Sequence, residues 1–305
     1  MSYEGEMLEK YKMPPRHQVE KHLLETLIKH NGVIKEFTVG EDIVDEVANS
    51  FNLSYEQREA YLETIYRKEN RVKKSNLWHR LLFRAASNLA KEKMITRPSK
   101  TYQLTNRREW MLTEEGFDEA LRIVGIPSSQ KDTLPIISYE VENITRKLLI
   151  NEKPKDYLPF RKKQSSIKTT TQSIRERGFR RAVIESYGYK CAICGLKLKA
   201  PNKNVWEVEA AHIIPHSSFG KDDIWNGLSL CRFHHWTFDV GWLSLDRDYK
   251  ILASTRISEL PNDMGRVWNF DLMSQLENKV IELPVNKNLW PDINAIRWHR
   301  ENIFK

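Results

Sequence analysis

This sequence has few cysteines, no long apolar run and no apolar N-terminus. Its 305 residues contain only three cysteines, an odd and small number that argues against the disulfide framework of a small secreted domain. No run of about 18 apolar residues occurs, so no membrane-spanning helix is predicted. The first ten residues lack the apolar core of a signal peptide. We therefore expect a cytoplasmic protein with no membrane partner.

The charge balance favours a polyanionic partner. The chain has 49 Lys and Arg against 41 Asp and Glu, which gives a net charge of +8 and a pI near 9.2. Such a balance suits nucleic acid, although basic pI values are also common among ordinary soluble proteins. The length and the 40% hydrophobic content suffice for two domains with cores of their own.

Helical signals dominate the N-terminal part of the chain. Residues 16–31 place apolar side chains at helical spacing and end at an Asn-Gly stop. Thr38 with Glu41, and Ser54 with Gln57, each fit a capping box. These pairs predict two further helices that begin just after Thr38 and Ser54.

A basic helix and a hairpin are expected next. Residues 73–94 form one apolar stripe, with Arg80, Arg84 and Lys91 on another face as candidate DNA contacts. Residues 95–116 then alternate like two short strands joined by basic, turn-prone residues. A short helix closes the unit. Helices followed by a hairpin suggest a winged helix.

Residues 13–124 resemble the N-terminal winged-helix domain of Mrr-type restriction proteins. The resemblance rests on F-N-L-S-Y-E-Q-R-E, on N-R-V-K-K-S-N-L-W-H-R-L-L-F-R-A-A-S-N-L and on Y-Q-L-T-N-R-R-E-W-M-L-T-E-E-G. It implies that the basic helix lies in the major groove of DNA and that Lys100, Arg107 and Arg108 belong to the wing. The alternative is that these cations only solubilise the surface.

Two domains are expected, at residues 1–124 and 172–305. Residues 125–171 have linker-like composition around one short helix at 141–149. A further helix leads to the first cysteine. Its cations are Arg175, Arg177, Arg180 and Arg181. They contact phosphate or form a solvated face, and the two alternatives have about equal weight.

Two ligand pairs predict a zinc site. Cys191 and Cys194 are separated by two residues, and so are Cys231 and His234. This spacing lets four ligands close a tetrahedron around Zn²⁺. The site would have no open position and would be structural. The alternative of small core cysteines beside a surface histidine leaves unexplained why every cysteine of the chain fits the pattern.

Three polar residues occur in the same region, in the order His212, Asn226, His235. Their neighbours are A-A-H-I-I-P, W-N-G-L-S-L-C and C-R-F-H-H. With these motifs, residues 179–245 resemble the HNH endonuclease family. The chain end W-P-D-I-N-A-I-R-W-H-R-E-N-I-F is similar to restriction-type HNH proteins.

The resemblance implies a ββα-metal finger in an α+β fold. A first strand should end near His212, a second strand should cover residues 228–230, and a helix should cover residues 231–240. Together with the winged helix, this gives a two-domain α+β protein whose C-terminal nuclease domain contains the structural zinc.

The family match also implies catalytic roles. His212 would be the general base, because phosphodiester hydrolysis requires a proton acceptor near pH 7. His235 would hold a catalytic Mg²⁺ or Mn²⁺ ion that stabilises charge on the leaving oxygen. Asp239, four residues later on the same helix face, is expected to complete the ligands. Asn226 is expected to fix the loop and the base.

The residue before the base departs from part of the family. An aspartate that ligates the metal stands there in those members, whereas this chain has Ala211. Glu209 shares the strand face of position 211 and is therefore the second candidate ligand after Asp239.

The sequence thus predicts a metal-dependent, restriction-type endonuclease that cuts double-stranded DNA. The winged helix would read a specific sequence or a methylated base, and a homodimer on DNA is expected because one HNH site cuts one strand. The alternatives are a non-catalytic, zinc-containing DNA-binding regulator and a homing or mobile-element nuclease. A regulator gives no reason for His212, Asn226, His235 and Asp239 to occur together.

Overall fold

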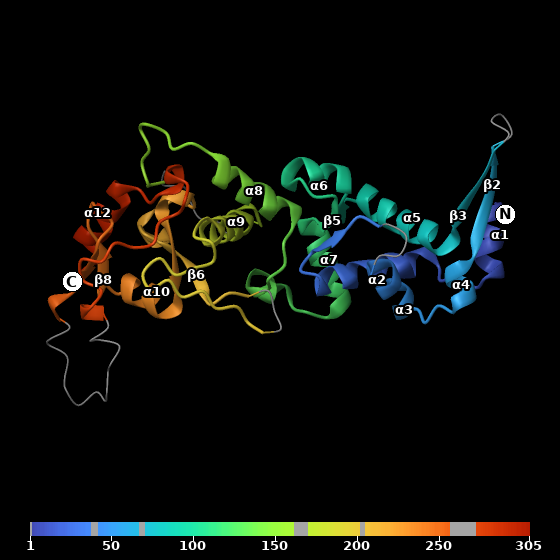
Figure 1. Cartoon of the computed structure of the whole chain (residues 1–305), viewed down its shortest axis with the longest axis horizontal. Helices are drawn as coiled ribbons and strands as arrows, with labels where there is room; N and C mark the ends of the chain where they lie inside the picture. The colour runs from blue at the N-terminus through green and yellow to red at the C-terminus, as the bar shows by residue number, and fades with distance from the viewer. Residues whose placement is uncertain (1, 38–41, 67–70, 162–169, 202–204, 257–272) are drawn as a thin grey trace, which may run out of the picture. The chain divides into compact units, whose positions relative to one another are not determined.

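The chain divides into two compact units, Met1–Glu142 and Asn143–Lys305 (Figure 1). The computed structural model describes residues 2–37, 42–66, 71–161, 170–201, 205–256 and 273–305. The boundary falls within helix α8 (Tyr139–Ile150), which is the short helix expected inside the linker. In the described ranges, no helix is long and apolar enough to cross a membrane.

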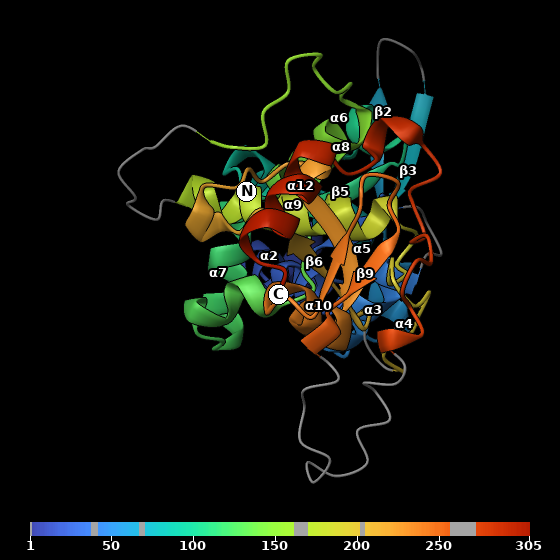
Figure 2. The same cartoon turned by 90° about the vertical axis from the view of Figure 1, so that its left-hand side faces the viewer.

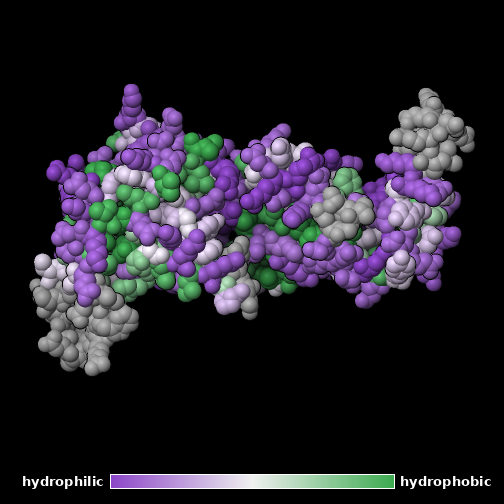
Figure 3. Space-filling model, viewed as in Figure 1, coloured by the Kyte–Doolittle hydropathy of each residue, from purple (hydrophilic) through white to green (hydrophobic). Residues whose placement is uncertain are grey.

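The first unit is mainly helical. Its elements in chain order are α1 (Tyr3–Lys10), α2 (Arg16–Lys29), β1 (Val33–Lys35), α3 (Asp42–Ser50), α4 (Tyr55–Glu59), β2 (Tyr61–Tyr66), β3 (Arg71–Asn76), α5 (Leu77–Lys91), β4 (Ile95–Thr96), α6 (Pro98–Thr105), β5 (Glu109–Leu112), α7 (Glu114–Val124) and η2 (Ser128–Thr133). The strands β1, β5 and β4 form an antiparallel sheet in that order, and β2 pairs with β3. Hydrophilic side chains predominate on the visible face over α5 and α6 (Figure 3).

The core of this unit follows the predicted helical stripes. Val19 and Leu23 of α2 and Leu82 of α5 are fully buried in it. The capping box of Ser54 and Gln57 is confirmed at the start of α4, with both reciprocal hydrogen bonds formed. The capping box expected at Thr38 and Glu41 lies outside the described residues.

The prediction of a hairpin at residues 95–116 is wrong for the connection between the two strands. β4 and β5 do pair antiparallel, but α6 stands between them. Pro98 occupies the first turn of α6, where its fixed φ and missing N–H are tolerated. Asn106 ends the helix with φ 58°, a left-handed conformation that asparagine tolerates well.

The helix predicted from residue 73 begins later, at Leu77. The Asn76 side chain caps it by accepting a hydrogen bond from the His79 backbone N–H at 2.8 Å. The preceding residues form β3 and pair with β2 instead, which gives a two-stranded hairpin that the sequence did not suggest. Residues 125–138, expected to be linker, also belong to the first unit, because Ile136 is buried in its core.

The second unit contains the expected ββα arrangement. Its elements are α9 (Thr170–Ser186), β6 (Val208–His212), η3 (His216–Ser218), η4 (Ile224–Asn226), β7 (Gly227–Cys231), α10 (Arg232–Asp239), β8 (Leu243–Leu245), β9 (Ile251–Ala253), η6 (Lys287–Leu289) and α12 (Ile293–Asn302). β6 pairs antiparallel with β7, and α10 follows directly. Figures 1 and 2 both show α10 beside β6. The two strands and the helix of the finger are therefore confirmed.

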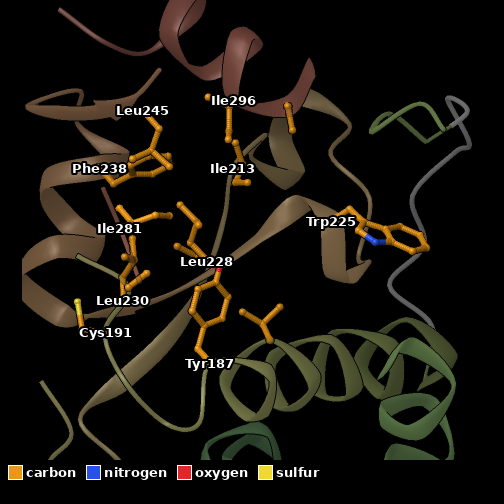
Figure 4. Close-up of a cluster of buried hydrophobic side chains, with 14 of the residues drawn as sticks. Tyr187, Cys191, Ile213, Trp225, Leu228, Leu230, Phe238, Leu245, Ile281 and Ile296 are labelled. Carbon is orange, nitrogen blue, oxygen red and sulfur yellow. The ribbon is translucent and has the colours of Figure 1, made fainter. Parts of the chain in front are cut away.

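One apolar core holds this finger in place. Leu228 and Leu230 of β7, Phe238 of α10 and Ile296 of α12 gather in it (Figure 4). α9 packs against both strands and contributes Phe179, which is fully buried. The two strands are thus covered by α9 and α10, and His212 stands at the end of β6.

Candidate functional site

The first feature of the site is a group of three cysteines and one histidine. The ligand atoms of Cys191, Cys194, Cys231 and His234 all lie within 4.8 Å of one another. His234 Nδ1 is 3.2 Å from the Cys231 sulfur and 3.5 Å from the Cys191 sulfur. Zinc bonds of about 2.3 Å to sulfur and about 2.0 Å to nitrogen fit a group of this size. The Cys₃His cluster can therefore hold a metal ion such as zinc.

The position of the cluster follows from the local fold. Cys191 and Cys194 lie on a turn after α9 that ends at Gly195, whose φ is +70°. Cys231 is the last residue of β7, and His234 lies in the first turn of α10. The pKa of the Cys191 thiol is lowered because the Cys194 and Cys231 thiols hydrogen-bond to its sulfur. A deprotonated sulfur is the form that ligates metal.

His212 stands at the end of β6, beside a carboxylate. Its Nε2 lies 3.0 Å from Oδ1 of Asp222. Its ring stacks on Phe179 of α9, with 4.2 Å between centroids and 21° between planes. The side chain remains 22% exposed, so solvent still reaches it.

Asn226 is fully buried and clamps the loop that joins β6 to β7. Its Nδ2 donates to the carbonyls of Ile214 and Lys221, at 3.1 and 3.0 Å. Its Oδ1 accepts from the Ile214 N–H at 2.9 Å. The amide thus ties together the two ends of a loop that begins next to His212.

His235 lies between two carboxylates. Its Nδ1 is 2.9 Å from Oε2 of Glu209 on β6, and its Nε2 is 3.4 Å from Oδ2 of Asp239 on α10. Glu209 also faces Arg232, at 3.4 Å. Glu209 and Asp239, the two candidate ligands predicted from the sequence, therefore both contact the His235 imidazole.

Position 211 lies in the apolar core of the second unit in this fold. The Ala211 side chain is fully buried in the apolar core of the unit. An ionised carboxylate there would have to be desolvated at a large energetic cost. A carboxylate from Glu209 or Asp239 at the surface avoids that cost.

The Asp239 carboxyl interacts electrostatically with both histidines. Partial burial raises the pKa of this carboxyl, nearby His235 and His212 lower it, and the like charge of Glu209 raises it. The net shift of the pKa is upward, because partial burial is the largest of these effects. Nitrogen and carboxylate oxygen donors are suitable ligands for a divalent cation, and a bound cation would stabilise both carboxylates in their ionised form.

The sequence did not point to Asp222. Only the acidic pair at 222–223, between His212 and Asn226, signalled a charged group in the loop. No spacing rule places a loop residue opposite a strand end, so the contact emerges only in the folded chain.

The cations expected to contact DNA in the first unit differ in their surroundings. Arg80 and Arg84 on α5 both contact Oε2 of Glu4, at 2.9 and 2.7 Å. Arg108 forms an ion pair with Glu36. The remaining cations of this set are Lys91 and Arg107, which are exposed, and Lys100, whose Nζ lies 4.5 Å from the centre of the Tyr139 ring.

The arginines of α9 are also in different environments. Arg180 is exposed, whereas Arg177 is only 8% exposed and belongs to the interior of the unit. Arg181 lies 3.9 Å from Glu185 on the same helix. Arg175 is also exposed, so Arg175 and Arg180 are the most accessible of the four for a phosphate.

Comparison with known proteins identifies the class of domain. Residues 191–246 match a family described as HNH endonuclease. The matched part contains the Cys₃His cluster, His212, His235 and Asp239. The chain thus contains an HNH endonuclease domain at 191–246, which supports a nuclease role.

One solved structure adds a weaker likeness. A chain titled "Modification dependent TagI restriction endonuclease" is 22% identical and matches 41% of this chain, with a TM-score of 0.30. This chain spans 37% of that chain's length. At this TM-score the likeness carries no argument. No curated protein matches the chain.

Proposed function

We propose that this protein is a metal-dependent, restriction-type DNA endonuclease that hydrolyses phosphodiester bonds in double-stranded DNA. The observation that carries the proposal is one partly exposed site in which His212 pairs with Asp222 and His235 pairs with Glu209 and Asp239. The match of residues 191–246 to the HNH endonuclease family supports it.

In this proposal, His212 is the general base. A neutral imidazole accepts a proton from water as the water oxygen attacks phosphorus and the bond to the 3′-oxygen breaks. The partial exposure of His212 leaves room for that water. Asn226 and Phe179 hold the base by fixing its loop and its ring face.

His235 and Asp239 would hold Mg²⁺ or Mn²⁺. Such an ion, when bound, stabilises the charge that develops on the departing oxygen. Only one ring nitrogen of His235 can ligate it. Nε2 faces Asp239, so Nδ1 is left to donate to Glu209. Metal-bound histidines commonly donate their second N–H to a carboxylate in this way. Asp239 is then the co-ligand, and Glu209 orients the ring.

The first unit would read the DNA as a winged helix. Its order α2, β1, α3, α5, β4, β5, with the sheet order β1-β5-β4, supports this assignment. The basic helix α5 would contact a specific sequence or a methylated base. Two copies on DNA would give a double-strand break, because each copy supplies one site.

A cleavage assay tests the proposal. Methylated and unmethylated plasmids are incubated side by side with Mg²⁺ and with Mn²⁺, and the ends are sequenced. His212→Ala should lower the cleavage rate by about 10² to 10⁴ while zinc content stays unchanged. His17→Ala, at an exposed position of the first unit, is the matched control. DNA binding without cleavage under every metal would favour the regulator instead.

A further inference from the structure

We infer that Asp222 is a positioning residue that holds His212 with Nε2 protonated, so that Nδ1 is the atom that accepts the proton from water. This inference rests on the proposed function. It concerns a loop residue that the family motif does not include, and it fixes which nitrogen does the chemistry.

The contact itself sets the tautomer. A carboxylate only accepts hydrogen bonds, so the 3.0 Å contact requires the hydrogen on Nε2 of His212. The lone pair of the neutral ring then lies on Nδ1. Burial raises the pKa of Asp222. The pKa is lowered by the hydrogen bond with His212 and by the charges of His212, His216 and Arg161, and the net result is a lowered pKa. Asp222 is thus ionised near pH 7.

The loop has little freedom to place Asp222 elsewhere. Asn226 ties it at Ile214 and Lys221. At Gly220, an added Cβ would meet the Ile214 carbonyl oxygen at 1.8 Å, so the chain passes too closely for any other residue. Asp222 lies between Gly220 and Asn226 in the sequence, and its side chain is only 12% exposed.

The segment at residues 157–161 supports the other side of the loop that contains Asp222. The Tyr157 hydroxyl donates to Asp223 at 2.5 Å. The Lys221 N–H donates to the Pro159 carbonyl at 3.0 Å, and the Arg161 N–H donates to the Phe219 carbonyl at 2.8 Å. This segment lies in the range that the sequence assigned to a linker. It instead belongs to the frame of the site.

The ring of His212 has one favoured orientation as a result. Phe179 covers one ring face, and Asp222 binds one nitrogen. When Nδ1 accepts the proton, the ring becomes an imidazolium, and the nearby carboxylate stabilises that charge. The other charged or titratable groups near this pair are His216, Arg161, Glu176, Asp223 and Asp239, and all of them stay in the chain when residue 222 is substituted.

The test is Asp222→Asn, with Asp223→Asn as the matched control. Both substitutions remove one loop carboxylate, but only Asp222 contacts His212. The amide that replaces the Asp223 carboxylate still offers an oxygen to the Tyr157 hydroxyl, so the frame of the loop is kept. We expect Asp222→Asn to lower kcat on the order of 10²-fold, the lower end of what a general base contributes, with KM changed less than about threefold. The acid limb of the pH–rate profile should move to lower pH, because the protonated ring loses its stabilising partner. Asp223→Asn should leave that limb in place.

A second readout needs no activity. In wild-type protein, ¹⁵N NMR should show the Nε2–H tautomer of His212, and Asp222→Ala should lose that preference while Asp223→Asn keeps it. An active wild type with an unmoved acid limb in Asp222→Asn, or an Nδ1–H tautomer, would overturn the inference and leave the proposed function intact. Full activity of His212→Ala would instead overturn the proposed function.

Discussion

Two adjacent histidines of α10 occupy opposite kinds of environment. His234 is 7% exposed and faces the sulfurs of Cys191 and Cys231. The His235 side chain is 24% exposed and faces the oxygens of Glu209 and Asp239. Consecutive residues on a helix point about 100° apart. One turn of helix can therefore serve a closed sulfur site and an open oxygen site at once.

The difference explains how the two sites depend on each other. Cys231 immediately precedes α10, so a metal in the Cys₃His cluster would fix where that helix begins. The helix in turn sets the distance of His235 from Glu209 on β6. The Cys₃His site therefore stabilises the oxygen site around His235. The Cys₃His site, in contrast, does not depend on the contacts of His235 with Glu209 and Asp239. This asymmetry is testable.

The largest effect is expected from removing the closed site. Cys231→Ser should lose bound zinc and unfold the second unit, because a structural zinc contributes on the order of 10 kcal/mol to small metal-binding folds. Metal analysis and thermal unfolding measure this, with the exposed Ser217→Ala as control. A metal-free Cys231→Ser protein with unchanged unfolding temperature would show that the cluster has no structural role.

The next effect separates the two histidines. His234→Ala should lose zinc and stability, and cleavage with them. His235→Ala should keep zinc and its unfolding temperature but cut DNA at least about 10² times more slowly, because it loses the cation that stabilises the leaving oxygen. Cleavage rates, zinc content and melting curves are measured on both. Equal loss of zinc in the two variants would contradict the division of roles.

A smaller effect distinguishes the two carboxylates. Asp239→Asn should raise the Mg²⁺ concentration needed for half-maximal cleavage more than Glu209→Gln does, since loss of a direct ligand is worse than loss of an orienting partner. For Glu209→Gln we expect a change of about tenfold, the low end for outer partners of metal-bound histidines. Glu209 also has Arg232 as a partner, which reduces the charge it offers a cation. The reverse order in a Mg²⁺ titration would make Glu209 the ligand.

The sequence predicted what depends on local spacing. The ligand pairs Cys191 with Cys194 and Cys231 with His234 lie close in the chain, and so do His235 and Asp239 on one helix face. These parts of the site follow from helix and turn geometry. The finger of β6, β7 and α10 was predicted in another way, from the resemblance of its short sequence motifs to the HNH endonuclease family.

What depends on distant segments could not be predicted in this way. Asp222 reaches His212 only through the clamped loop, and Glu4 reaches Arg80 across most of the first unit's sequence. The helix α6 was missed because its Pro and basic residues are equally typical of a turn. Burial of Arg177 likewise depends on how α9 packs. Tertiary contacts decided each of these cases.

The smallest effect concerns a third histidine against α10. His299 is 1% exposed, stacks on Phe238, donates from Nε2 to the Phe238 carbonyl and accepts at Nδ1 from Ser244. Burial lowers its pKa to about 4, although the bond to the Phe238 carbonyl raises it slightly. The unfolded chain binds this proton near pH 6.5, so the folded state loses stability as pH falls from about 6.5 towards 4.

At pH 5.5 the loss from His299 should be about 1 kcal/mol relative to pH 7.5. Urea unfolding at the two pH values measures it, and His299→Gln, which keeps a donor for Phe238, should remove that share of the difference. An NMR titration of the His299 ring gives an independent check, and a midpoint near 6.5 in the folded protein would rule the effect out. Because His299 binds the backbone of α10 at Phe238, its protonation would loosen the C-terminal end of the helix. Acid should then weaken cleavage before the Cys₃His cluster releases its metal.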